Sequence, residues 1–577
     1  MNLKNFENIV VVDFEFYGDD GDHQKPICVV SKNLKTNNVK RIWLHKNSQT
    51  PPPFKLDEDT LYVGFYTPAE MRCHLALDWP LPHNLLDLYV EFRNLTNGDG
   101  RYKKAGLIHA MMYFNLKTIS VRDKEELRNL ILSGGPYTDE EKKAILDYCQ
   151  SDVEGTCELF MEMRDMINLE EALLRGRYAV AAAKIERNGI PIDTEIYQRL
   201  ESNWEEIKLR LIEKFDEQYD IYEGTTFKMN KFADYLKKNN IPWPRTDKGN
   251  LKTCEDTFDE MSQKYPELKP LKELTSNLAS LKLHELNVGS DGRNRGMLSI
   301  FGAKTSRNTP STSDFIFSMG KWIRGLIKPE PGYGLAYIDW EQQEFGIAAV
   351  LSGDKNMIEA YETGDPYLDF AKKAGEAPED ATKETHPEVR EAFKRCSLAV
   401  MYGMGEQSFA KSIDCSISKA KRLVNYHRRV FSGFWEWLDE LMDYTMFFSE
   451  LHTRFGWKIN IDKDTSARTI RNFPMQANGS EILRLACCFA TERGVKVAAP
   501  VHDAILIEAE LEELDEAIKT TEEAMRKASE YVLDGFSLRT DVEKRIEYPE
   551  RYMSEDGKET WNNVMDILEE VEDENVK

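Results

Sequence analysis

Two strand-like apolar runs that end in acidic residues constrain this chain more than any other feature of its sequence. Residues 9–12 form the first run and lead directly to Asp13 and Glu15, and residues 333–339 form the second, which ends at Asp339. The chain has 577 residues, whereas single hydrophobic cores rarely grow beyond roughly 250–300 residues. The sequence therefore predicts a multidomain α/β protein in which the two runs belong to different domains.

Asp13 and Glu15 follow the first run two positions apart. In a strand this spacing places both carboxylates on the same face. Two carboxylates that emerge together from apolar surroundings cost free energy unless a cation neutralises them, and hard oxygen ligands suit Mg²⁺ or Mn²⁺. The pair therefore indicates a divalent metal site, although solvated acids at a strand end are the commoner explanation of D-x-E alone.

A helix is predicted over residues 138–165, because Thr138-x-x-Glu141 forms a capping box at its start. Tyr148 and Asp152 are four residues apart on this helix, which places a phenol beside a carboxylate. Taken alone, the pair is better explained as a contact on a helix surface.

Three other stretches carry local signals. The first 100 residues predict short strands and turns, and a helical stretch over 180–190 is expected to end at RNGIPID, where a glycine and a proline interrupt it. The Gly/Ser/Thr-rich basic segment 289–313 predicts a functional loop rather than core. Residues 564–577 hold six acids and one lysine, which predicts a frayed tail.

Asp503 lies in a tight polar turn between two strands that are predicted over 498–508. Asp339 and Asp503 each have an ordinary explanation, since strand ends and turns both favour aspartate. A helix is predicted over 386–403 with a capping box at 385–388. One side of it carries two cations, an aliphatic residue and an aromatic residue at intervals of four: Arg390, Lys394, Leu398 and Tyr402. This stripe could bind a phosphate at one end and a base at the other. For such a stripe alone, the solvated edge of an amphipathic helix is the commoner explanation.

The formal net charge of −24 excludes a surface that is basic throughout. It permits nucleic-acid binding in a groove, because binding depends on the electrostatic potential of the local surface and not on the net charge. Residues 292–329 hold seven Lys or Arg and one acid. Nine cysteines without any CxxC pair predict a reduced compartment and no structural zinc. Since no signal pattern and no apolar run of roughly 20 residues occurs, we expect a cytoplasmic protein without membrane contact.

The N-terminal acids resemble the DEDD family of 3′→5′ exonucleases, in the form that contains a tyrosine. Its first and third motifs, D-x-E and Y-x-x-x-D, are matched by Asp13, Glu15, Tyr148 and Asp152. The middle motif, FYTPAE, places Tyr66 and Glu70 where Asn and Asp are usual. The resemblance implies two-metal hydrolysis, with metal held by Asp13, Glu15, Glu70 and Asp152, and with the attacking water oriented by Tyr148.

Three later segments resemble motifs A, B and C of family A DNA polymerases, in the same order: DWEQQEFGIAAVLSGD, REAFKRCSLAVMYGMG and VHDA. GAKTSR, Arg324 and Asn472-x-x-x-Gln476 are further matches. The resemblance implies template-directed DNA synthesis with 3′→5′ proofreading in phage or bacterial replication, with two Mg²⁺ ions, or Mn²⁺, at each active site. The alternative is a metal-dependent 3′→5′ nuclease whose C-terminal part binds DNA without synthesis. A non-catalytic scaffold is disfavoured by the intact acids.

The resemblance also assigns roles position by position. Asp339 and Asp503 are expected to hold the polymerase metals, and Lys394 to donate a proton to pyrophosphate. Contacts with the dNTP are expected from Arg390, Lys394, Glu344, Leu398, Tyr402 and Tyr367, of which Glu344 and Tyr402 exclude a 2′-hydroxyl. Contacts with the primer–template are expected from Arg307, Asn472, Gln476 and His502.

Four departures from the family pattern are expected to alter rate or selectivity without removing activity. Leu398 stands where Phe or Tyr is usual, and Ala399 replaces a Gly. Ala504 replaces the Glu of motif C, and Tyr367 stands where many relatives have a His.

The implied architecture is an RNase H-like exonuclease domain at 1–165 followed by a right-hand polymerase domain at 166–577. Its thumb is expected near 196–290, its palm near 291–353 and 490–560, and its fingers near 354–489. The implied partners are primer–template DNA and dNTPs, and a processivity factor or replisome proteins are further candidates. A monomer is expected, in the cytoplasm of a bacterial host if the chain is phage-encoded.

Overall fold

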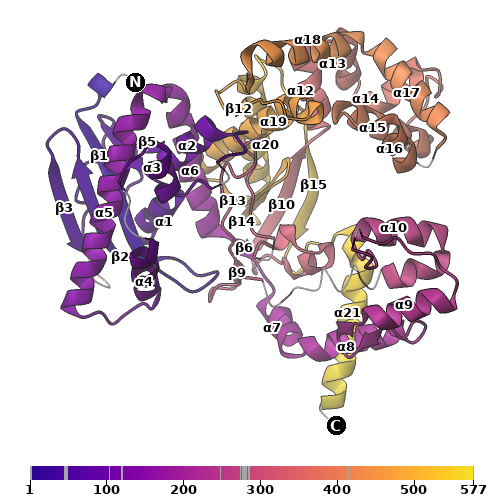
Figure 1. Ribbon diagram of the computed structural model, residues 1–577, viewed down its shortest axis with the longest axis horizontal. Coiled ribbons are helices and arrows are strands. Elements are labelled where there is room, and N and C mark those ends of the chain that lie inside the picture. The colour runs from indigo at the N-terminus through magenta and orange to yellow at the C-terminus, as the bar shows by residue number, and fades with distance from the viewer. Residues whose placement is uncertain are drawn as a thin grey trace.

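The computed structural model describes residues 3–44, 50–102, 104–117, 121–246, 248–272, 275, 283, 286–312, 314–413 and 415–575. Figure 1 shows an N-terminal lobe built on a sheet, a second sheet near the centre, and two helical lobes that extend from this centre. Separate buried clusters form in the N-terminal lobe, beneath the central sheet and within residues 212–271. The predicted multidomain α/β class is confirmed.

Five strands form the N-terminal sheet, in the order β3-β2-β1-β4-β5. They are β1 (Asn8–Tyr17), β2 (Lys25–Asn33), β3 (Asn38–Trp43), β4 (Thr60–Gly64) and β5 (Asn84–Asp87). The pairs β1–β2 and β2–β3 are antiparallel, whereas β1–β4 and β4–β5 are parallel. Ile9 and Val11 on β1 pack on one face of the sheet and Val10 and Val12 on the other. Because side chains alternate along a strand, Asp13 shares the face of Val11.

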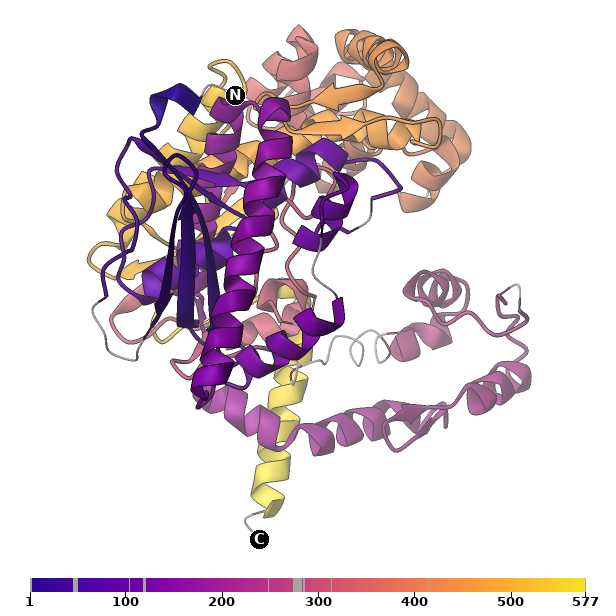
Figure 2. The ribbon, with the colours of Figure 1, turned by 60° about the vertical axis from the view of Figure 1, so that its left-hand side comes forward.

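Five helices accompany this sheet: α1 (Pro68–Ala76), α2 (Leu88–Thr96), α3 (Leu107–Tyr113), α4 (Val121–Leu132) and α5 (Asp139–Met163). Helix α5 runs along the sheet (Figure 2). The prediction of only strands and turns in the first 100 residues is wrong for α1 and α2. Both begin at residues that also favour turns, Pro68 in the first turn of α1 and Asp87 as the cap of α2.

The predicted capping box at the start of α5 is confirmed. The backbone N–H of Thr138 donates to Glu141 Oε2 at 2.7 Å, and the N–H of Glu141 donates to Thr138 Oγ1 at 3.2 Å. Two of the first helical N–H groups are thereby satisfied. The helix therefore begins at a fixed residue, which sets the positions of Tyr148 and Asp152 further along it.

Helix α6 (Leu169–Asn188) joins the N-terminal lobe to the rest of the chain. It packs against α1 and β5 as well as against α19 (Ala467–Glu492) and β13 (Lys496–Val501). A Cβ at Gly176 would lie 1.8 Å from the carbonyl oxygen of Leu85, so only glycine permits this approach. The helix ends at Gly189, whose φ of +63° is left-handed, and this confirms the predicted stop at RNGIPID.

The N-terminal lobe is also held to the hairpin of β11 (Glu450–His452) and β12 (Lys458–Asn460). Asn94 donates to the Gly456 carbonyl at 3.0 Å and accepts from the Lys458 N–H at 2.7 Å. Nearby, Arg175 forms a buried ion pair with Glu91 at 2.7 Å. These buried polar contacts fix the orientation of the N-terminal lobe.

The central sheet has the order β13-β14-β10-β15 and is antiparallel throughout. It is formed by β13, β14 (Ala504–Glu510), β10 (Tyr333–Trp340) and β15 (Thr540–Glu547). The strand predicted over 333–339 and the strand–turn–strand over 498–508 are confirmed. Helix α20 (Leu514–Val532) packs on β10 and β14. The smaller pair β6 (Ile190–Pro191) and β9 (Arg293–Asn294) lies beside this sheet.

One helical lobe follows β10. It contains α12 (Gln343–Ser352), α13 (Lys355–Glu362), α14 (Pro366–Lys373), α15 (Pro387–Met401), α16 (Glu406–Ser412), α17 (Ile417–Val430) and α18 (Ser432–Phe448). The predicted helix at 386–403 is α15, but its predicted capping box is wrong. Pro387 fixes the first turn, so His386 is the N-cap. The Thr385 hydroxyl instead contacts Thr382 and His386.

The second helical lobe contains α7 (Thr194–Ser202), α8 (Trp204–Asp216), α9 (Met229–Lys238), α10 (Glu255–Lys264) and the pair β7 (Tyr222–Glu223) and β8 (Thr226–Phe227). Helix α21 (Glu555–Asn575) packs against α8. The prediction of a frayed tail is therefore wrong for the described residues of 564–577. Val564 and Leu568 are fully buried, and Glu572 pairs with Arg199 at 2.5 Å, so the acids face cations while the apolar stripe faces the core.

The segment 289–313 is predicted to be a functional loop rather than core, and the exclusion from the core is wrong for three of its apolar residues. Leu298, Ile300 and Phe301 are buried in the main core, because turns within the segment direct its few apolar side chains inward. Short 3₁₀ helices occur at Leu3–Asn5, Arg164–Met166, Pro266–Leu268, Ile316–Ser318 and Lys321–Leu326. Within the part of the chain that the structure describes, no helix has the length and apolar character needed to span a membrane.

Candidate active sites

The central sheet brings Asp339 and Asp503 together from residues far apart in the sequence. Asp339 is the next-to-last residue of β10, and Asp503 lies in the turn between β13 and β14. Ala504 pairs with Asp339 across the strands, and the backbone N–H of Trp340 donates to the Asp503 carbonyl at 3.4 Å. His502 has a φ of +56°, which turns the chain sharply enough for Asp503 to lie beside the end of β10.

Burial and the nearby carboxylates both disfavour the charged form of Asp339. Burial is the larger cause, and together with the charges of Asp503, Glu543, Asp541 and Glu341, in that order, it raises the pKa of Asp339 to about 7. Asp541 lies directly opposite Asp339 on β15. Divalent cations would relieve this repulsion, and the oxygen donors are those that Mg²⁺ and Mn²⁺ prefer. The residues present therefore fit the metal ions that the sequence implies.

The raised pKa of Asp339 predicts that the stability of the folded chain depends on pH. The pKa of Asp339 in the folded chain, about 7, lies above its ordinary value of 3.8. The folded state therefore binds more protons between these values, and stability falls as the pH rises through this window. We expect Asp339→Asn, which cannot ionise, to melt about 1–3 °C higher than wild type at pH 8 with EDTA, a difference that shrinks toward pH 4. Thermal melts across this range measure it, and equal melting temperatures at pH 8 would contradict it.

Helix α15 carries the predicted stripe, and the residues at its two ends contact acidic side chains. Arg390 forms an ion pair with Asp365, and its guanidinium lies 5.8 Å from the centre of the Tyr367 ring. Lys394 and Leu398 follow at partly exposed positions on the same side. Tyr402, at the C-terminal end of the helix, donates a hydrogen bond to Glu344 at the start of α12.

Glu344 connects three parts of this site. It accepts from Tyr402 and from Arg307, whose Nη2 lies 3.3 Å from Glu344 Oε1. Burial, followed by the hydrogen bond and charge of Glu344, raises the pKa of Tyr402, so its hydroxyl stays protonated and remains a donor. Gln342, at the N-cap of α12, is left-handed with φ +49°, so the helix starts within motif A, directly after the end of β10. Glu344 therefore lies in the first turn of this helix, a few residues after Asp339 in the sequence.

Tyr367 is a buried aromatic residue that packs against neighbouring rings. Its side chain is 4% exposed and packs edge-on against Phe345, with ring centres 5.9 Å apart. Burial raises its pKa, so it stays a neutral phenol. It can therefore support the Arg390 guanidinium through its ring, but it cannot supply a positive charge to a phosphate.

Two of the four predicted DNA contacts line one cavity, and the other two lie on α19. Arg307 and His502 line a cavity of about 390 Å³. Gln476, on α19, forms a side-chain hydrogen bond with Tyr402. Asn472 lies one turn earlier on α19, and its buried Oδ1 has no hydrogen-bond partner among the described residues. The structure thus brings the DNA candidates to the same region as the α15 stripe and leaves a buried acceptor available to a ligand.

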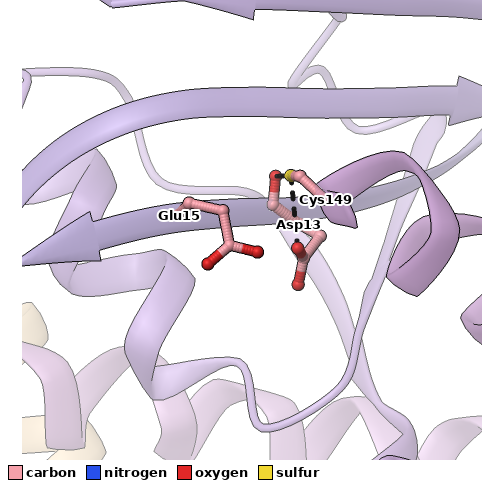
Figure 3. A group of neighbouring side chains, drawn as sticks. All are labelled: Asp13, Glu15 and Cys149. Carbon is pink, nitrogen blue, oxygen red and sulfur yellow. Dashed lines mark hydrogen bonds between the residues drawn. The ribbon is translucent and has the colours of Figure 1, made fainter. Parts of the chain in front are cut away.

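A second acidic group lies in the N-terminal lobe. Ligand atoms of Asp13, Glu15 and Cys149 all lie within 4.8 Å of one another, and Figure 3 shows the thiol directed at the Asp13 carboxylate. Asp13 and Glu15 come from β1, and Cys149 comes from α5. Two carboxylates with a third donor fit a divalent ion, and Asp13 and Glu15 are two of the four metal ligands that the sequence predicts.

The remaining predicted exonuclease residues surround this group. Glu70 is 4% exposed, and burial and the nearby Asp13 raise its pKa well above the usual range. Tyr148 hydrogen-bonds to Asp152, and its pKa is raised by burial and then by Asp152 and Glu15. Neither Glu70 nor Asp152 belongs to the group within 4.8 Å.

The middle exonuclease motif lies at a turn whose backbone is held by Asp87. Tyr66, where the family has Asn, takes a left-handed φ of +68°, and its N–H donates to Asp87 Oδ1 at 2.9 Å. Asp87 also accepts from Thr67 and from the Tyr89 N–H that begins α2. Burial raises the pKa of Asp87 to about 6 against these hydrogen bonds. Asp87 therefore holds the turn before α1 in place and has no capacity left for a metal.

Sequence reasoning missed several groups at these sites. Asp365 pairs with Arg390, and Asp541 and Glu543 contribute to the field at Asp339. Cys149 contacts Asp13. Only weak sequence signals could have pointed to these residues. Asp365 precedes a proline at a helix start, Cys149 directly follows Tyr148, and the acids of β15 alternate along a strand.

A model of DNA polymerase family A matches residues 226–547 of the chain. DNA polymerase I of Aquifex aeolicus is 27% identical over 434 residues, which cover 68% of this chain and 73% of that protein. Thermostable DNA polymerase I of Thermus thermophilus is 24% identical over 253 residues, 41% of this chain and 29% of that protein. The DNA polymerase of Mycobacterium phage D29 is 24% identical, covering 56% of this chain and 54% of that protein. The chain thus spans less than two thirds of the last two.

A solved structure resembles the fold over most of its length. It is the POL domain of Pol1 from M. smegmatis, determined in complex with DNA primer–template and dNTP. The match has a TM-score of 0.71 at 18% sequence identity and covers 92% of this chain and 94% of that one. At this identity the match establishes a shared fold.

Proposed function

The chain belongs to DNA polymerase family A, and from this premise we propose that it extends a DNA primer by template-directed addition of deoxynucleotides. The observation that carries the proposal is the meeting of Asp339 and Asp503 at one end of the central sheet. Glu344 follows the same strand end and hydrogen-bonds to Tyr402 on α15. Paired carboxylates and a cation-bearing helix are the groups that nucleotidyl transfer requires.

Asp339 and Asp503 would hold two divalent ions, Mg²⁺ or Mn²⁺, in this proposal. When bound, such ions activate the primer hydroxyl and neutralise the triphosphate. Arg390 and Lys394 bind the triphosphate from α15, and Asp365 orients Arg390 for this contact. Lys394 donates a proton to the leaving pyrophosphate. Arg307, Asn472, Gln476 and His502 contact the primer–template through the minor groove, which reads shape rather than sequence.

Selection of the sugar is assigned to Glu344, Tyr402 and Leu398. Glu344 occupies the space beside Tyr402 where a 2′-hydroxyl would lie, and its hydrogen bond to the phenol holds both side chains. Leu398 supports the sugar on the same side of α15. These residues therefore favour dNTPs over rNTPs.

We expect Glu344→Ala to reduce discrimination against ribonucleotides at least about tenfold, or about 1.4 kcal/mol. The smaller side chain leaves room for the 2′-hydroxyl and removes the partner of Tyr402. Single-nucleotide incorporation measures it as the ratio of kcat/KM for a dNTP and the matching rNTP. Tyr402→Phe keeps the ring and should change the ratio less. An unchanged ratio in Glu344→Ala would exclude this assignment.

The N-terminal lobe is proposed to be a 3′→5′ proofreading exonuclease. Asp13, Glu15, Glu70 and Asp152 would hold its divalent ions, and Tyr148 would orient the attacking water. The hydrogen bond between Tyr148 and Asp152 and the closeness of Asp13 to Glu15 support these roles. We propose the exonuclease domain at 1–165 and the polymerase domain at 166–577, with the thumb near 196–290, the palm near 291–353 and 490–560, and the fingers near 354–489.

The proposed setting is DNA replication by a monomer in a bacterial cytoplasm, with primer–template DNA and dNTPs as its ligands. The similarity to the phage D29 polymerase supports a phage origin. A processivity factor or replisome proteins are further proposed partners.

Primer extension tests the proposed polymerase against its rival. A labelled primer on a longer template is incubated with the full chain and Mg²⁺, with and without dNTPs. We expect extension that follows the template sequence when dNTPs are present, and shortening of the primer when they are absent. If the primer is only shortened under both conditions, the polymerase proposal fails and the chain is a nuclease whose C-terminal part binds DNA.

A further inference from the structure

We propose that the N-terminal lobe positions a DNA-binding residue of the polymerase site. Arg93, on α2, and Asn97, the C-cap of α2, are the positioning residues. They hold the backbone segment 302–306, and this segment in turn places Arg307. The inference rests on the proposed polymerase function, in which Arg307 contacts the primer–template. It gives the N-terminal lobe a part in synthesis, beyond the excision that is proposed for it.

The segment before Arg307 has a backbone that needs support from its surroundings. Ser299, Phe301 and Ser306 have left-handed φ angles of +48°, +54° and +59°. Residues other than glycine avoid this conformation and persist in it only where surrounding contacts enforce it. Because Ser306 directly precedes Arg307, the contacts that fix this backbone also fix the direction in which the Arg307 side chain leaves it.

Two side chains of the N-terminal lobe donate hydrogen bonds to carbonyl groups of this segment. Arg93 Nη2 donates to the Gly302 carbonyl at 2.5 Å, and Asn97 Nδ2 donates to the Lys304 carbonyl at 2.7 Å. Asn97 is buried, and its amide also donates to the Lys458 carbonyl at 2.6 Å. Because both amide protons are engaged, the side chain is held in one orientation. The N-terminal lobe therefore grips the segment at two alternate carbonyls.

Two donors from the polymerase part of the chain complete the support. Trp457 Nε1, directly before β12, donates to the Lys304 carbonyl at 2.9 Å. Figure 1 shows α2 next to β12. Arg484, on α19, donates to the Ser306 carbonyl at 2.8 Å, and its guanidinium lies 4.3 Å from the centre of the Phe301 ring. The carbonyls of 302 and 304 thus depend on α2, whereas the carbonyl of 306 is held by α19.

Arg307 is less constrained than the segment that leads to it. Its side chain is 40% exposed, and its Nη2 lies 3.3 Å from Glu344 Oε1, which is long for a hydrogen bond. It lines the cavity of about 390 Å³ beside His502. Its position therefore depends on its backbone, and through it on the donors from α2. If these donors only joined the two lobes, their loss would not weaken DNA binding.

Binding of a fluorescein-labelled primer–template duplex, followed by fluorescence anisotropy in EDTA without dNTPs, tests the proposal. Asn97→Asp keeps the shape of the side chain but places a carboxylate against two carbonyls, so we expect Kd to rise at least about tenfold. Arg93→Ala should act in the same direction, and Arg93→Lys, which retains a donor for Gly302, should recover most of the affinity. Asn84→Ala is the matched control. The Asn84 amide donates to the Glu58 carbonyl at 2.8 Å within the N-terminal lobe, so its loss should change Kd less than about twofold.

A double-mutant cycle with Arg307→Ala measures whether the effect passes through Arg307. In that background Asn97→Asp should weaken binding less than about twofold, because the residue that it positions is gone. In primer extension, Asn97→Asp alone should raise KM for the duplex about tenfold and leave kcat within about threefold. Degradation of single-stranded 3′ ends should continue at the wild-type rate, because the N-terminal acids are untouched.

The outcomes separate this proposal from the polymerase proposal. An unchanged Kd in both Asn97→Asp and Arg93→Ala overturns the positioning role, and so do effects that are fully additive with Arg307→Ala. If the variants weaken DNA binding as expected but the wild-type chain incorporates no dNTP, the positioning role stands and the polymerase proposal fails. If the wild type extends the primer and both variants bind and extend equally well, only the positioning role fails.

Discussion

Asp503→Ala is expected to lower kcat/KM for dNTP incorporation at least about 10³-fold, because loss of a metal-binding carboxylate removes several kcal/mol of transition-state stabilisation. Asp503 lies beside Asp339 only because the β13–β14 turn meets the end of β10. The register leaves Ala504, not another acid, opposite Asp339. No neighbour on β14 can therefore replace the lost ligand.

Primer extension under single-turnover conditions measures this effect, with Asp541→Asn as the matched control. Asp541 faces Asp339 across β15 but is exposed, so it acts mainly through its field and its loss should cost less than about tenfold. Degradation of single-stranded 3′ ends should be unchanged in both variants, because the N-terminal acids are untouched. Extension by Asp503→Ala at more than a tenth of the wild-type rate would remove Asp503 from the catalytic site.

Most predictions that rest on local signals agree with the structure, and the capping box predicted at 385–388 is an exception. The apolar runs before Asp13 and Asp339 are strands, and the capping box at Thr138 begins α5. Strand alternation and hydrogen bonds within one turn depend on neighbouring residues alone, so the sequence contains the information. For the same reason the spacing of Tyr148 and Asp152 correctly placed them side by side.

Features that depend on distant contacts could not be read in this way. Helix α21 is stabilised by burial of Val564 and Leu568 and by the ion pair between Glu572 and Arg199, none of which an acidic composition reveals. The burial of Phe301 depends on packing against Trp457, whose ring centre lies 5.2 Å away. Tertiary packing overrides composition wherever the apolar partner lies elsewhere in the chain.

Candidate sites show the same division. Motif residues could be assigned by resemblance, but the partners that orient them could not. Asp365 holds Arg390 across 25 positions in the chain, and Cys149 contacts Asp13 across 136. The fold brings such partners to the motif residues from distant parts of the sequence. A motif records only the residues that take part in the reaction, so it does not reveal these partners.

Asp152→Ala is expected to reduce degradation of single-stranded 3′ ends at least about 10³-fold while leaving primer extension within about twofold of wild type. The substitution removes a proposed metal ligand and the partner of the Tyr148 hydroxyl. The proposed polymerase acids lie on the separate central sheet, so synthesis should continue. Release of labelled 3′ nucleotides without dNTPs measures the first effect, and extension of a matched primer measures the second.

Asp147→Ala provides the control on the same helix. Asp147 is half-exposed and pairs with Arg41 at 2.5 Å, a surface contact worth at most about 1 kcal/mol, so both activities should persist. A variant lacking Asp152 should also retain mismatched primer ends that wild type removes, because excision and synthesis use different acids. If Asp152→Ala degrades single strands as fast as Asp147→Ala, the N-terminal lobe does not use this acid for hydrolysis. The nuclease activity would then have to be assigned elsewhere in the chain.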